Sequence, residues 1–178
     1  AGIDRATRLV EQLLVLARQQ ASAATGVKTE PVALADIVRQ ELIDATSSAQ
    51  AHALDIGLAH ADEGDVVGQP EALRILVRNL VDNALKYTPS GGKIDLEVRL
   101  TGDRVVLGID DSGPGIAEPD RDRVLDRFYR VEGTQAPGSG LGLAIVHAIA
   151  DFHHATLTLG RSAALGGLRV TVSFPVAG

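Results

Sequence analysis

The sequence predicts an α+β fold, built as a two-layer sandwich in which a mixed, mostly antiparallel sheet has helices on one face. Three observations lead to this class. Segments with helical periodicity and segments with alternating apolar and polar residues are interspersed along the chain. They lack the regular strand–helix alternation that is typical of a parallel sheet. Short glycine-containing turns join two pairs of alternating segments, as in antiparallel hairpins.

Composition limits the class of protein. The chain has 178 residues, of which 45% are hydrophobic, which suits one domain or one domain with an appendage. It contains no cysteine, which excludes disulfides and thiolate metal sites. Its formal net charge of −6 argues against nonspecific binding to nucleic acid. No apolar run approaches the length of a membrane span. Since methionine is absent even at position 1, we expect a fragment of a longer protein.

Residues 3–20 are predicted to form a helix. Its apolar side chains fall near heptad spacing, with charged residues outside the stripe. A helix of this length is marginal alone in water, so we expect it to pair with a partner in this chain or in another. The small and polar residues 21–30 are predicted to be a linker. The members of the apolar stripe are Ile3, Ala6, Val10, Leu13, Leu14 and Ala17.

The next segments predict two helices and three short strands. Residues 31–33, 53–59 and 65–68 are predicted as strands, the second of them from its alternation. Residues 34–51 have helical spacing, and residues 69–87 form a longer amphipathic helix. The second helix ends at "TPSGG", where proline and glycine act as stop signals.

The remaining segments predict a hairpin, a short helix, a loop, a further helix and a closing pair of strands. Both strands of the hairpin are apolar at alternate positions and are joined by "TGD". The closing strands flank a Gly-Gly pair. These elements occupy residues 93–100 and 104–110, 117–127, 131–140, 141–152, and 155–160 with 168–174.

The glycine-rich stretch "GSGLGLAIV", residues 138–146, is suited to anions. It is no P-loop, because Gly142 is followed by Leu143 and Ala144 rather than by lysine and serine or threonine. It also lacks the spacing and the preceding strand of a dinucleotide fingerprint. Glycines let backbone N–H groups approach a phosphate closely, and the helix that begins near residue 141 points its positive end there. A flexible loop without a ligand remains the alternative.

A second glycine element, "DDSGPGI" at residues 110–116, follows directly on a strand. A carboxylate at the strand end, with Gly113 and Gly115 around a proline, makes a tight bend beside open space. A buried carboxylate needs a donor, and the exocyclic amine of adenine would serve. An ordinary Asp-Ser-Gly turn is the alternative.

The helix at residues 69–87 places polar side chains on one face. Asn79, Asn83 and Lys86 are spaced i, i+4 and i+7 and therefore share this face, away from the apolar stripe. Two amides and an ammonium group could hold hydrated Mg²⁺ and triphosphate oxygens, because Mg²⁺ takes hard oxygen ligands and keeps several waters. A solvated helix face is the alternative.

Four segments occur in one order, "NLVDNALKYT", "DDSGPGI", "RFYR" and "GSGLGLAIV". This ordered set resembles the ATP-binding catalytic domain of bacterial sensor histidine kinases, whose superfamily shares its Bergerat-type nucleotide fold with gyrase, Hsp90 and MutL. The resemblance covers about residues 30–176. Residues 3–20 also resemble the second helix of the kinase dimerisation hairpin. The resemblance as a whole implies three parts: a partial hairpin at 1–22, a linker at 23–29 and the ATP-binding domain at 30–178.

The resemblance also implies roles for individual residues. Asn83 would contact the magnesium ion and Asp111 would recognise the adenine amine. Asn83, Lys86 and Arg130 would serve catalysis, Lys86 and Arg130 by reaching phosphate oxygens. The full set expected around ATP and Mg²⁺ is Asn79, Asn83, Lys86, Tyr87, Asp111, Gly113, Gly115, Ile116, Phe128, Arg130, Gly138, Ser139, Gly140, Leu141, Gly142 and Leu143.

The function that the resemblance implies is that of a protein-histidine kinase. The domain would bind Mg-ATP and donate its γ-phosphate to a histidine on its own dimerisation domain, for relay to the receiver domain of a response regulator. In this family the phosphoryl acceptor is a histidine that is followed by an acidic residue. This motif is absent here and would lie upstream. The full-length protein is expected to be a homodimer anchored in the bacterial inner membrane, with this domain in the cytoplasm and no nucleic-acid partner.

Two other functions remain open at this point. An ATP-driven conformational clamp would need an acidic residue on the asparagine helix, and the nearest is Asp82, about 100° around the helix from Asn83. A scaffold that kept the fold but binds no nucleotide is the other. His153 and His154 are adjacent, but without cysteine or a suitably spaced third ligand they do not predict a metal site.

Overall fold

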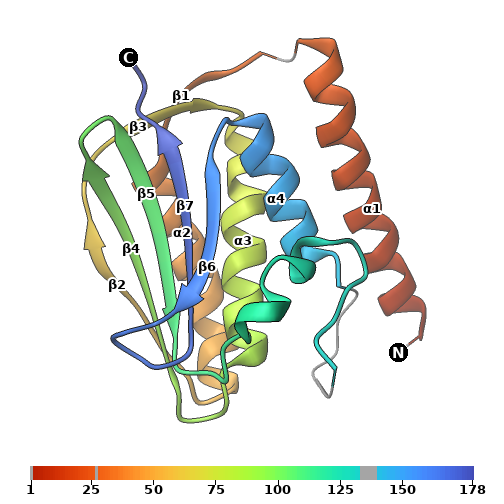
Figure 1. Cartoon of the computed structure of the whole chain (residues 1–178), viewed down its shortest axis with the longest axis vertical. Coiled ribbons are helices and arrows are strands. Elements are labelled where there is room, and N and C mark those ends of the chain that lie inside the picture. Colours follow the sequence, from red (N-terminus) through yellow and green to blue (C-terminus); the bar gives the residue numbers. More distant parts are fainter. Residues whose placement is uncertain (1, 27, 133–139) are drawn as a thin grey trace.

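The computed structural model describes residues 2–26, 28–132 and 140–178, and it confirms the predicted α+β class. One layer is a five-stranded sheet in the order β2-β4-β5-β7-β6. Helices α2, α3 and α4 cover one face of this sheet (Figure 1). The strands are β2 (Asp55–Ala61), β4 (Lys93–Thr101), β5 (Arg104–Asp111), β6 (Thr156–Arg161) and β7 (Leu168–Pro175), and the helices are α2 (Leu34–Ala51), α3 (Pro70–Tyr87) and α4 (Gly142–Phe152).

The sheet is mixed and mostly antiparallel, as predicted. Strands β4 and β5 form the predicted hairpin, β5 pairs antiparallel with β7, and β7 with β6. Only β2 and β4 run parallel in this sheet. Strands β1 (Glu30–Ala33) and β3 (Asp65–Gly68) pair with each other in a separate two-stranded ladder. The sequence predicts both of these short strands but not their pairing.

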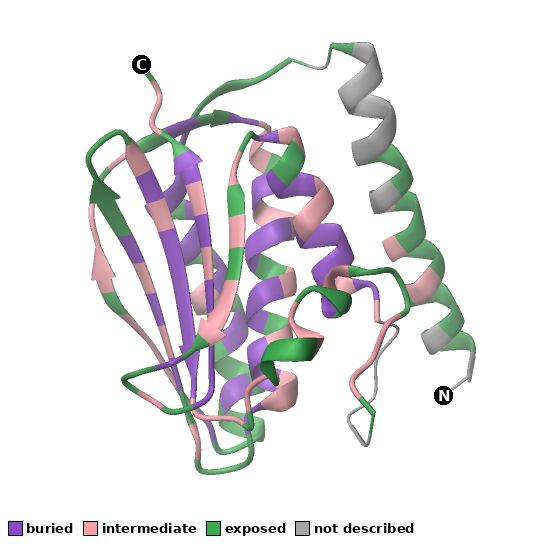
Figure 2. Ribbon diagram, viewed as in Figure 1, coloured by how far each residue is buried: buried purple, intermediate pink, exposed green. Residues whose placement is uncertain are grey.

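The core lies between the sheet and the three helices, where the buried residues gather (Figure 2). Ile94, Leu96 and Val98 alternate along β4 with outward-facing polar residues, and all three are fully buried. Leu73 and Leu76 on α3 are equally buried. Burying side chains of this size stabilises the fold by about 1.5–3 kcal/mol each. The amphipathic pattern of α3 therefore determines which of its faces packs in the core and which face is left outside it.

Helix α1 (Gly2–Thr25) lies against α4 and extends beyond the predicted end at residue 20 (Figure 1). Residues 21–25, predicted as linker, are therefore helical. Leu9 and Val15 pack toward the core, whereas the predicted apolar stripe faces away from it. Ile3, Val10 and Leu14 remain 50–83% exposed. In the described part of the chain, the stripe has no covering partner.

Two further boundaries differ from the prediction. Strand β2 begins at Asp55 because Ala53 adopts a positive φ of 53° in the turn that ends α2, where Leu54 N donates to Ala49 O. The short helix predicted at 117–127 is instead two 3₁₀ turns, η1 (Glu118–Asp120) and η2 (Arg123–Leu125). Val124 is the only buried residue of the two turns, too little apolar surface to hold an α-helix.

Among the described residues, no helix is long and apolar enough to cross a membrane.

An ion pair between the half-exposed Arg78 and the buried Glu41 joins α2 to α3. Arg78 binds both carboxylate oxygens of Glu41, at 3.1 and 3.2 Å, and Glu41 is only 3% exposed. Replacing Arg78 with alanine leaves this carboxylate buried and unpaired, and should lower the free energy of unfolding by about 1–3 kcal/mol in urea titrations. Arg74→Ala, which removes the exposed 3.9 Å pair with Glu71 on the same helix, should change it by less than about 0.5 kcal/mol. Equal effects of the two substitutions would contradict this account.

Candidate functional site

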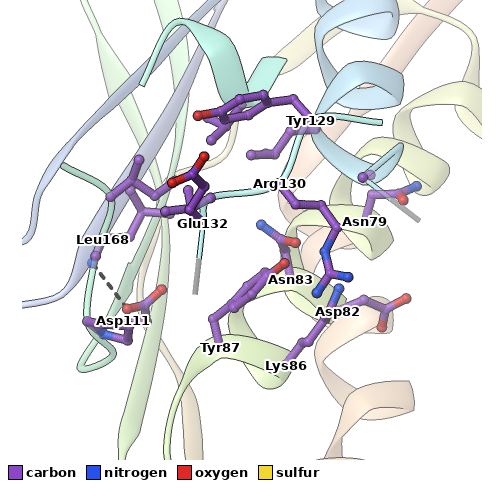
Figure 3. A pocket seen from close by; sticks show the side chains of 18 of the residues that line it. Asn79, Asp82, Asn83, Lys86, Tyr87, Asp111, Tyr129, Arg130, Glu132 and Leu168 are labelled. Carbon is purple, nitrogen blue, oxygen red and sulfur yellow. Dashed lines mark hydrogen bonds between the residues drawn. The ribbon is translucent and has the colours of Figure 1, made fainter. Parts of the chain in front are cut away.

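A pocket of about 740 Å³ opens where α3, the loop after β5 and the segment before α4 meet (Figure 3). Its volume falls within the range of small-molecule and cofactor sites. The lining mixes apolar side chains with amides, carboxylates and cations. Residues predicted for the site that line it are Asn79, Asn83, Lys86, Tyr87, Asp111, Gly115, Ile116, Arg130, Gly140, Gly142 and Leu143.

Helix α3 supplies the polar wall of the pocket. Asn79, Asn83 and Lys86 all line it, because their spacing puts them on one face while the apolar stripe of the helix is buried. Asn79 Nδ2 donates to Ile75 O at 2.8 Å, which fixes the amide so that its oxygen faces the start of α4. A Cβ added to Gly142 would lie 3.6 Å from that oxygen. The side chain of Arg130 extends toward Asn83 and Lys86 from the opposite wall (Figure 3). Cations thus converge at this end.

Asp111 forms the other end of the pocket. It is the last residue of β5 and is 5% exposed. Its Oδ1 accepts hydrogen bonds from Gly113 N at 2.9 Å and from Leu168 N at 3.1 Å. Among the described residues, its Oδ2 accepts none, although it lines the pocket. A carboxylate oxygen that is left open to the pocket in this way can accept a hydrogen bond from a ligand.

The pKa of Asp111 reports these surroundings. Burial raises the pKa of this carboxyl above its ordinary value, the amides of Leu168 and Gly113 oppose the rise, and the charge of Asp110 adds to it. The pKa of Asp82, which also lines the pocket, is raised by burial, and Arg78 opposes that rise. Asp82 is the residue that the clamp alternative would need, and its position in the pocket keeps that alternative testable.

Two glycines leave space for the carboxylate of Asp111 and the backbone amides that bind it. A Cβ added to Gly167 would overlap the carbonyl and carboxylate oxygens of Asp111 and lie 2.6 Å from Gly113 N. A Cβ at Gly113 would lie 2.8 Å from Tyr87 O and 3.1 Å from Asp111 Oδ1. Gly113 therefore acts behind the carboxylate rather than on the pocket surface. The sequence predicts a role for Gly113 but misses Gly167, which it assigns only to the turn between two strands.

The two ends of the segment before α4 are held together by backbone contacts. Phe128 N donates to Gly140 O at 3.0 Å, and both residues have positive φ, 63° and 74°. A Cβ at Gly140 would lie 2.7 Å from the backbone carbon of Phe128. Glycine at this position is therefore required by both space and conformation. The predicted residues Gly138 and Ser139 lie outside the described part of the chain.

Two other predicted residues do not line the pocket. Phe128 is 54% exposed and does not line the cavity, although its backbone meets Gly140. Leu141 is fully buried at the N-cap of α4 and belongs to the core.

The sequence also misses residues that the fold brings to the pocket from elsewhere. Leu168 comes from the start of β7, and Arg8 and Gln12 come from α1 because that helix lies against α4. No local signal in the sequence predicts that these three residues reach the pocket. The remaining lining residues that were not predicted are Asp82, Pro114, Val124, Tyr129, Val131 and Glu132.

The pocket holds no ready-made metal site of its own. In the described ranges, no group of three or more histidine and acidic side chains could hold an ion. His153, considered above, uses both ring nitrogens in hydrogen bonds with Gln69 N at 3.1 Å and Ile149 O at 2.7 Å. A cation in the pocket would therefore depend on amide oxygens such as that of Asn83 together with oxygens of a ligand.

Comparison with known proteins gives consistent results. The family model described as "Histidine kinase-, DNA gyrase B-, and HSP90-like ATPase" matches residues 68–178. The sensor protein QseC of Escherichia coli (strain K12) is 40% identical over 175 residues, which are 98% of this chain and 38% of QseC. The chain thus spans about two fifths of the length of the curated relatives it matches.

Solved structures are similar over nearly the whole chain. Full-length ShkA in complex with AMPPNP has a TM-score of 0.83 at 26% identity, over 98% of this chain and 36% of ShkA. The cytoplasmic segment of histidine kinase QseC has a TM-score of 0.63 at 29% identity, over 99% of this chain and 97% of that segment. The chain therefore belongs to the histidine kinase-, DNA gyrase B- and HSP90-like ATPases and carries the catalytic domain of a sensor histidine kinase.

Proposed function

We propose that this chain binds Mg-ATP in the pocket and donates the γ-phosphate to a histidine on its own dimerisation domain, for relay to a response regulator. One observation carries the proposal: Asn83 and Asp111, from different elements, line the same pocket. The AMPPNP bound in the ShkA structure supports a nucleotide as the ligand of this fold.

Asp111 is assigned to the adenine amine. Its Oδ1 is occupied by two backbone amides, so Oδ2 is the oxygen left to accept a hydrogen bond from a ligand. A charge-assisted bond to the amine contributes about 1.5–3 kcal/mol. Ile116 and Leu168 also line the pocket, and their apolar side chains suit the faces of a purine ring.

Asn83, Lys86 and Arg130 are assigned to the triphosphate. The amide oxygen of Asn83 suits Mg²⁺, which takes few protein ligands and completes its shell with water and phosphate oxygens. When bound, the ion would neutralise charge that develops on the transferred phosphoryl group. Lys86 and Arg130 face the same space and would orient the phosphates, with Arg130 the candidate for the terminal one. Phosphoryl transfer depends mainly on such positioning and charge neutralisation.

The acceptor histidine is proposed to lie on a dimerisation domain outside this chain. Residues 1–22 are assigned to the second helix of its hairpin and 30–178 to the ATP-binding domain. Residues 23–29 are assigned to the connection between them, in which 23–25 continue helix α1. The exposed apolar stripe on α1 supports this, because a four-helix bundle would cover it. We further propose that the full-length protein is a homodimer anchored in the bacterial inner membrane, with this domain in the cytoplasm.

Asn83→Ala and Asp111→Ala should each weaken Mg-ATP binding about tenfold to a hundredfold in calorimetry, because each removes a hydrogen bond or ligand to a charged group. The circular dichroism spectrum should remain that of the wild type. Gln50→Ala and Asp44→Ala, which alter exposed residues of α2 away from the pocket, serve as matched controls and should bind normally. Unchanged affinity in both pocket variants would refute the assignment.

Gly167→Ala should lower nucleotide affinity at least tenfold, although residue 167 carries no side chain and does not line the pocket. The added methyl group would displace the carboxylate of Asp111 from its two amide donors. Gly166→Ala, in the same turn with nothing within 4 Å of its Cβ, controls for backbone strain at its φ of 84°. If G166A and G167A reduce calorimetric affinity equally, the contact with Asp111 is not the cause.

Incubation with γ-labelled ATP and a separately made acceptor hairpin tests the transfer itself. We expect label on the histidine of the hairpin, and none when the chain carries Asn83→Ala. Steady hydrolysis of ATP without transfer would favour the clamp function, with Asp82 as the group that activates water. Neither binding nor hydrolysis would favour a scaffold.

A further inference from the structure

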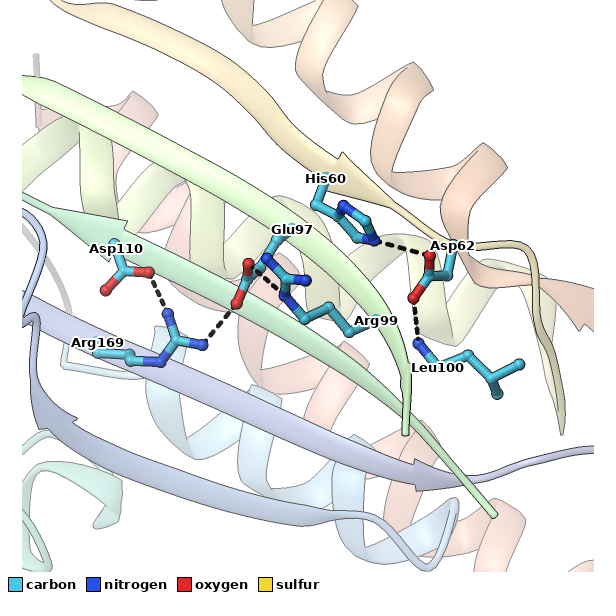
Figure 4. A network of polar contacts seen from close by, with 7 residues as sticks. All are labelled: His60, Asp62, Glu97, Arg99, Leu100, Asp110 and Arg169. Atoms are coloured by element: carbon cyan, nitrogen blue, oxygen red, sulfur yellow. Dashed lines mark hydrogen bonds and ion pairs between the residues drawn. The ribbon is translucent and has the colours of Figure 1, made fainter. Parts of the chain in front are cut away.

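A network of charged side chains lies on the outer face of the sheet, opposite the helices (Figure 4). Arg169 on β7 stands directly across from Asp110 on β5, and its Nη1 forms an ion pair with Asp110 Oδ2. Its Nη2 donates to Glu97 Oε1 on β4 at 2.6 Å. Glu97 also accepts from Arg99 Nε at 2.8 Å. One guanidinium group thus ties three neighbouring strands together.

Strand β5 leaves space for this tie. Gly108 pairs directly with Glu97 in the ladder. A Cβ at Gly108 would lie 3.0 Å from Glu97 Cγ and 3.2 Å from Arg169 Nη2. The missing side chain is therefore what allows Arg169 to reach across β5. Glycine weakens a strand interior, and its position here coincides with a close approach of charged groups.

The network acts next to the pocket without touching it. Asp110 and Asp111 are consecutive in β5, so their side chains point to opposite faces of the sheet. In the same way, Arg169 follows Leu168, whose N–H donates to Asp111 Oδ1 at 3.1 Å. Gly167 N also donates to Asp111 O at 3.0 Å. The ion pair between Arg169 and Asp110 therefore lies at the last residue pair between β5 and β7, directly beside the hydrogen bonds that orient Asp111.

Charge links the two faces as well. Asp110 is 7% exposed, and its negative charge raises the pKa of Asp111. Hydrogen bonds and charge from Glu97 and Asp110 raise the pKa of Arg169, so this guanidinium remains a cation and offsets the charge of Asp110. Further charged or titratable groups lie on the elements around Asp111. In the described part of the chain they include Lys93 and Asp95 on β4, Asp82, Lys86 and Tyr87 on α3, Tyr129, Arg130 and Glu132 on the segment before α4, and Arg8 on α1.

We propose that Arg169 is a positioning residue for nucleotide recognition, which, through Asp110 and the Leu168 amide, keeps the carboxylate of Asp111 ionised and aimed into the pocket. The proposal rests on the assignment of Asp111 to the adenine amine.

The direction of the effect follows from the charges. ATP affinity that depends on the Asp111 carboxylate is lost as the pH falls through its pKa. Removing the cation of Arg169 leaves the charge of Asp110 uncompensated, which raises that pKa further, so affinity is lost at a higher pH. Removing the charge of Asp110 has the opposite effect, and affinity is lost at a lower pH. Protonation of ATP itself is common to every variant and cancels in the comparison.

The experiment is calorimetric titration of the chain with Mg-ATP from about pH 8 down to about pH 4, close to the ordinary pKa of an aspartate, at low ionic strength, where partly exposed charges are least screened. Arg169→Gln should move the pH of half-maximal affinity upward by about half a unit or more. Arg169→Lys should stay close to the wild type, and Asp110→Asn should move downward. The double variant with Arg169→Gln and Asp110→Asn should show the same pH of half-maximal affinity as Asp110→Asn alone.

Arg104→Gln is the matched control, because Arg104 lies on the same face and ties β5 to β7 through Ser173 Oγ at 3.0 Å, without a carboxylate. It should leave the pH profile unchanged. A purely structural role for Arg169 predicts the same loss of affinity at every pH, and that result would overturn the proposal, as would an equal upward shift with and without the Asp110 charge. Should Arg169→Gln fail to fold by circular dichroism, Arg169→Lys and Asp110→Asn alone decide the outcome.

The variant Asp111→Asn distinguishes a failure of this proposal from a failure of the assignment of Asp111 to the adenine amine. If the wild type binds Mg-ATP and Asp111→Asn loses affinity while Arg169→Gln behaves as the wild type, only the role of Arg169 is refuted. If Asp111→Asn binds as the wild type does, the assignment of the adenine site itself fails.

Discussion

The hydrogen bonds that hold Asp111 Oδ1 are the constraint on which the site depends. Both donors are backbone amides, one from the bend after β5 and one from the start of β7, so the carboxylate is oriented by the course of the chain rather than by another side chain. This requires glycine at residue 167, where a Cβ would collide with the oxygens of Asp111, and at residue 113, where it would collide with Tyr87 O. It also requires the antiparallel pairing of β5 with β7, which brings residue 168 beside residue 111.

The other half of the site follows from the periodicity of α3. A helix that buries a stripe against a sheet leaves its opposite face free, and in α3 that face carries two amides and an ammonium group beside the pocket. Neither element makes a nucleotide site alone. The sheet contributes an acceptor in a buried setting, and the helix contributes groups suited to oxyanions and a hard cation. Their separation across one pocket matches a ligand with a polar base at one end and a charged chain at the other.

The sequence predicts the elements well because periodicity is local. Asn79, Asn83 and Lys86 share a face by spacing alone, and Asp111 is recognisable because it follows a strand and precedes two glycines. Contacts between distant segments could not be predicted: Leu168 and Gly167 reach Asp111 only through strand pairing, and the position of α1 brings Arg8 into the pocket. Prediction also went wrong at residues 117–127, where helix-like composition lacks an apolar face, and at residues 21–25, where small residues continue a helix. The domain boundaries and the roles assigned to individual site residues remain predictions.

The most direct measurement is the preference of the chain for a 6-amino group on the purine. The affinity of the wild type for ATP should be compared with its affinity for purine riboside triphosphate, which has the same triphosphate and ring but no amine. This account predicts that ATP binds at least about tenfold more tightly, since the analogue gives Asp111 Oδ2 no amine donor. Equal affinities for the two nucleotides would show that Asp111 does not read the base and would contradict the central claim.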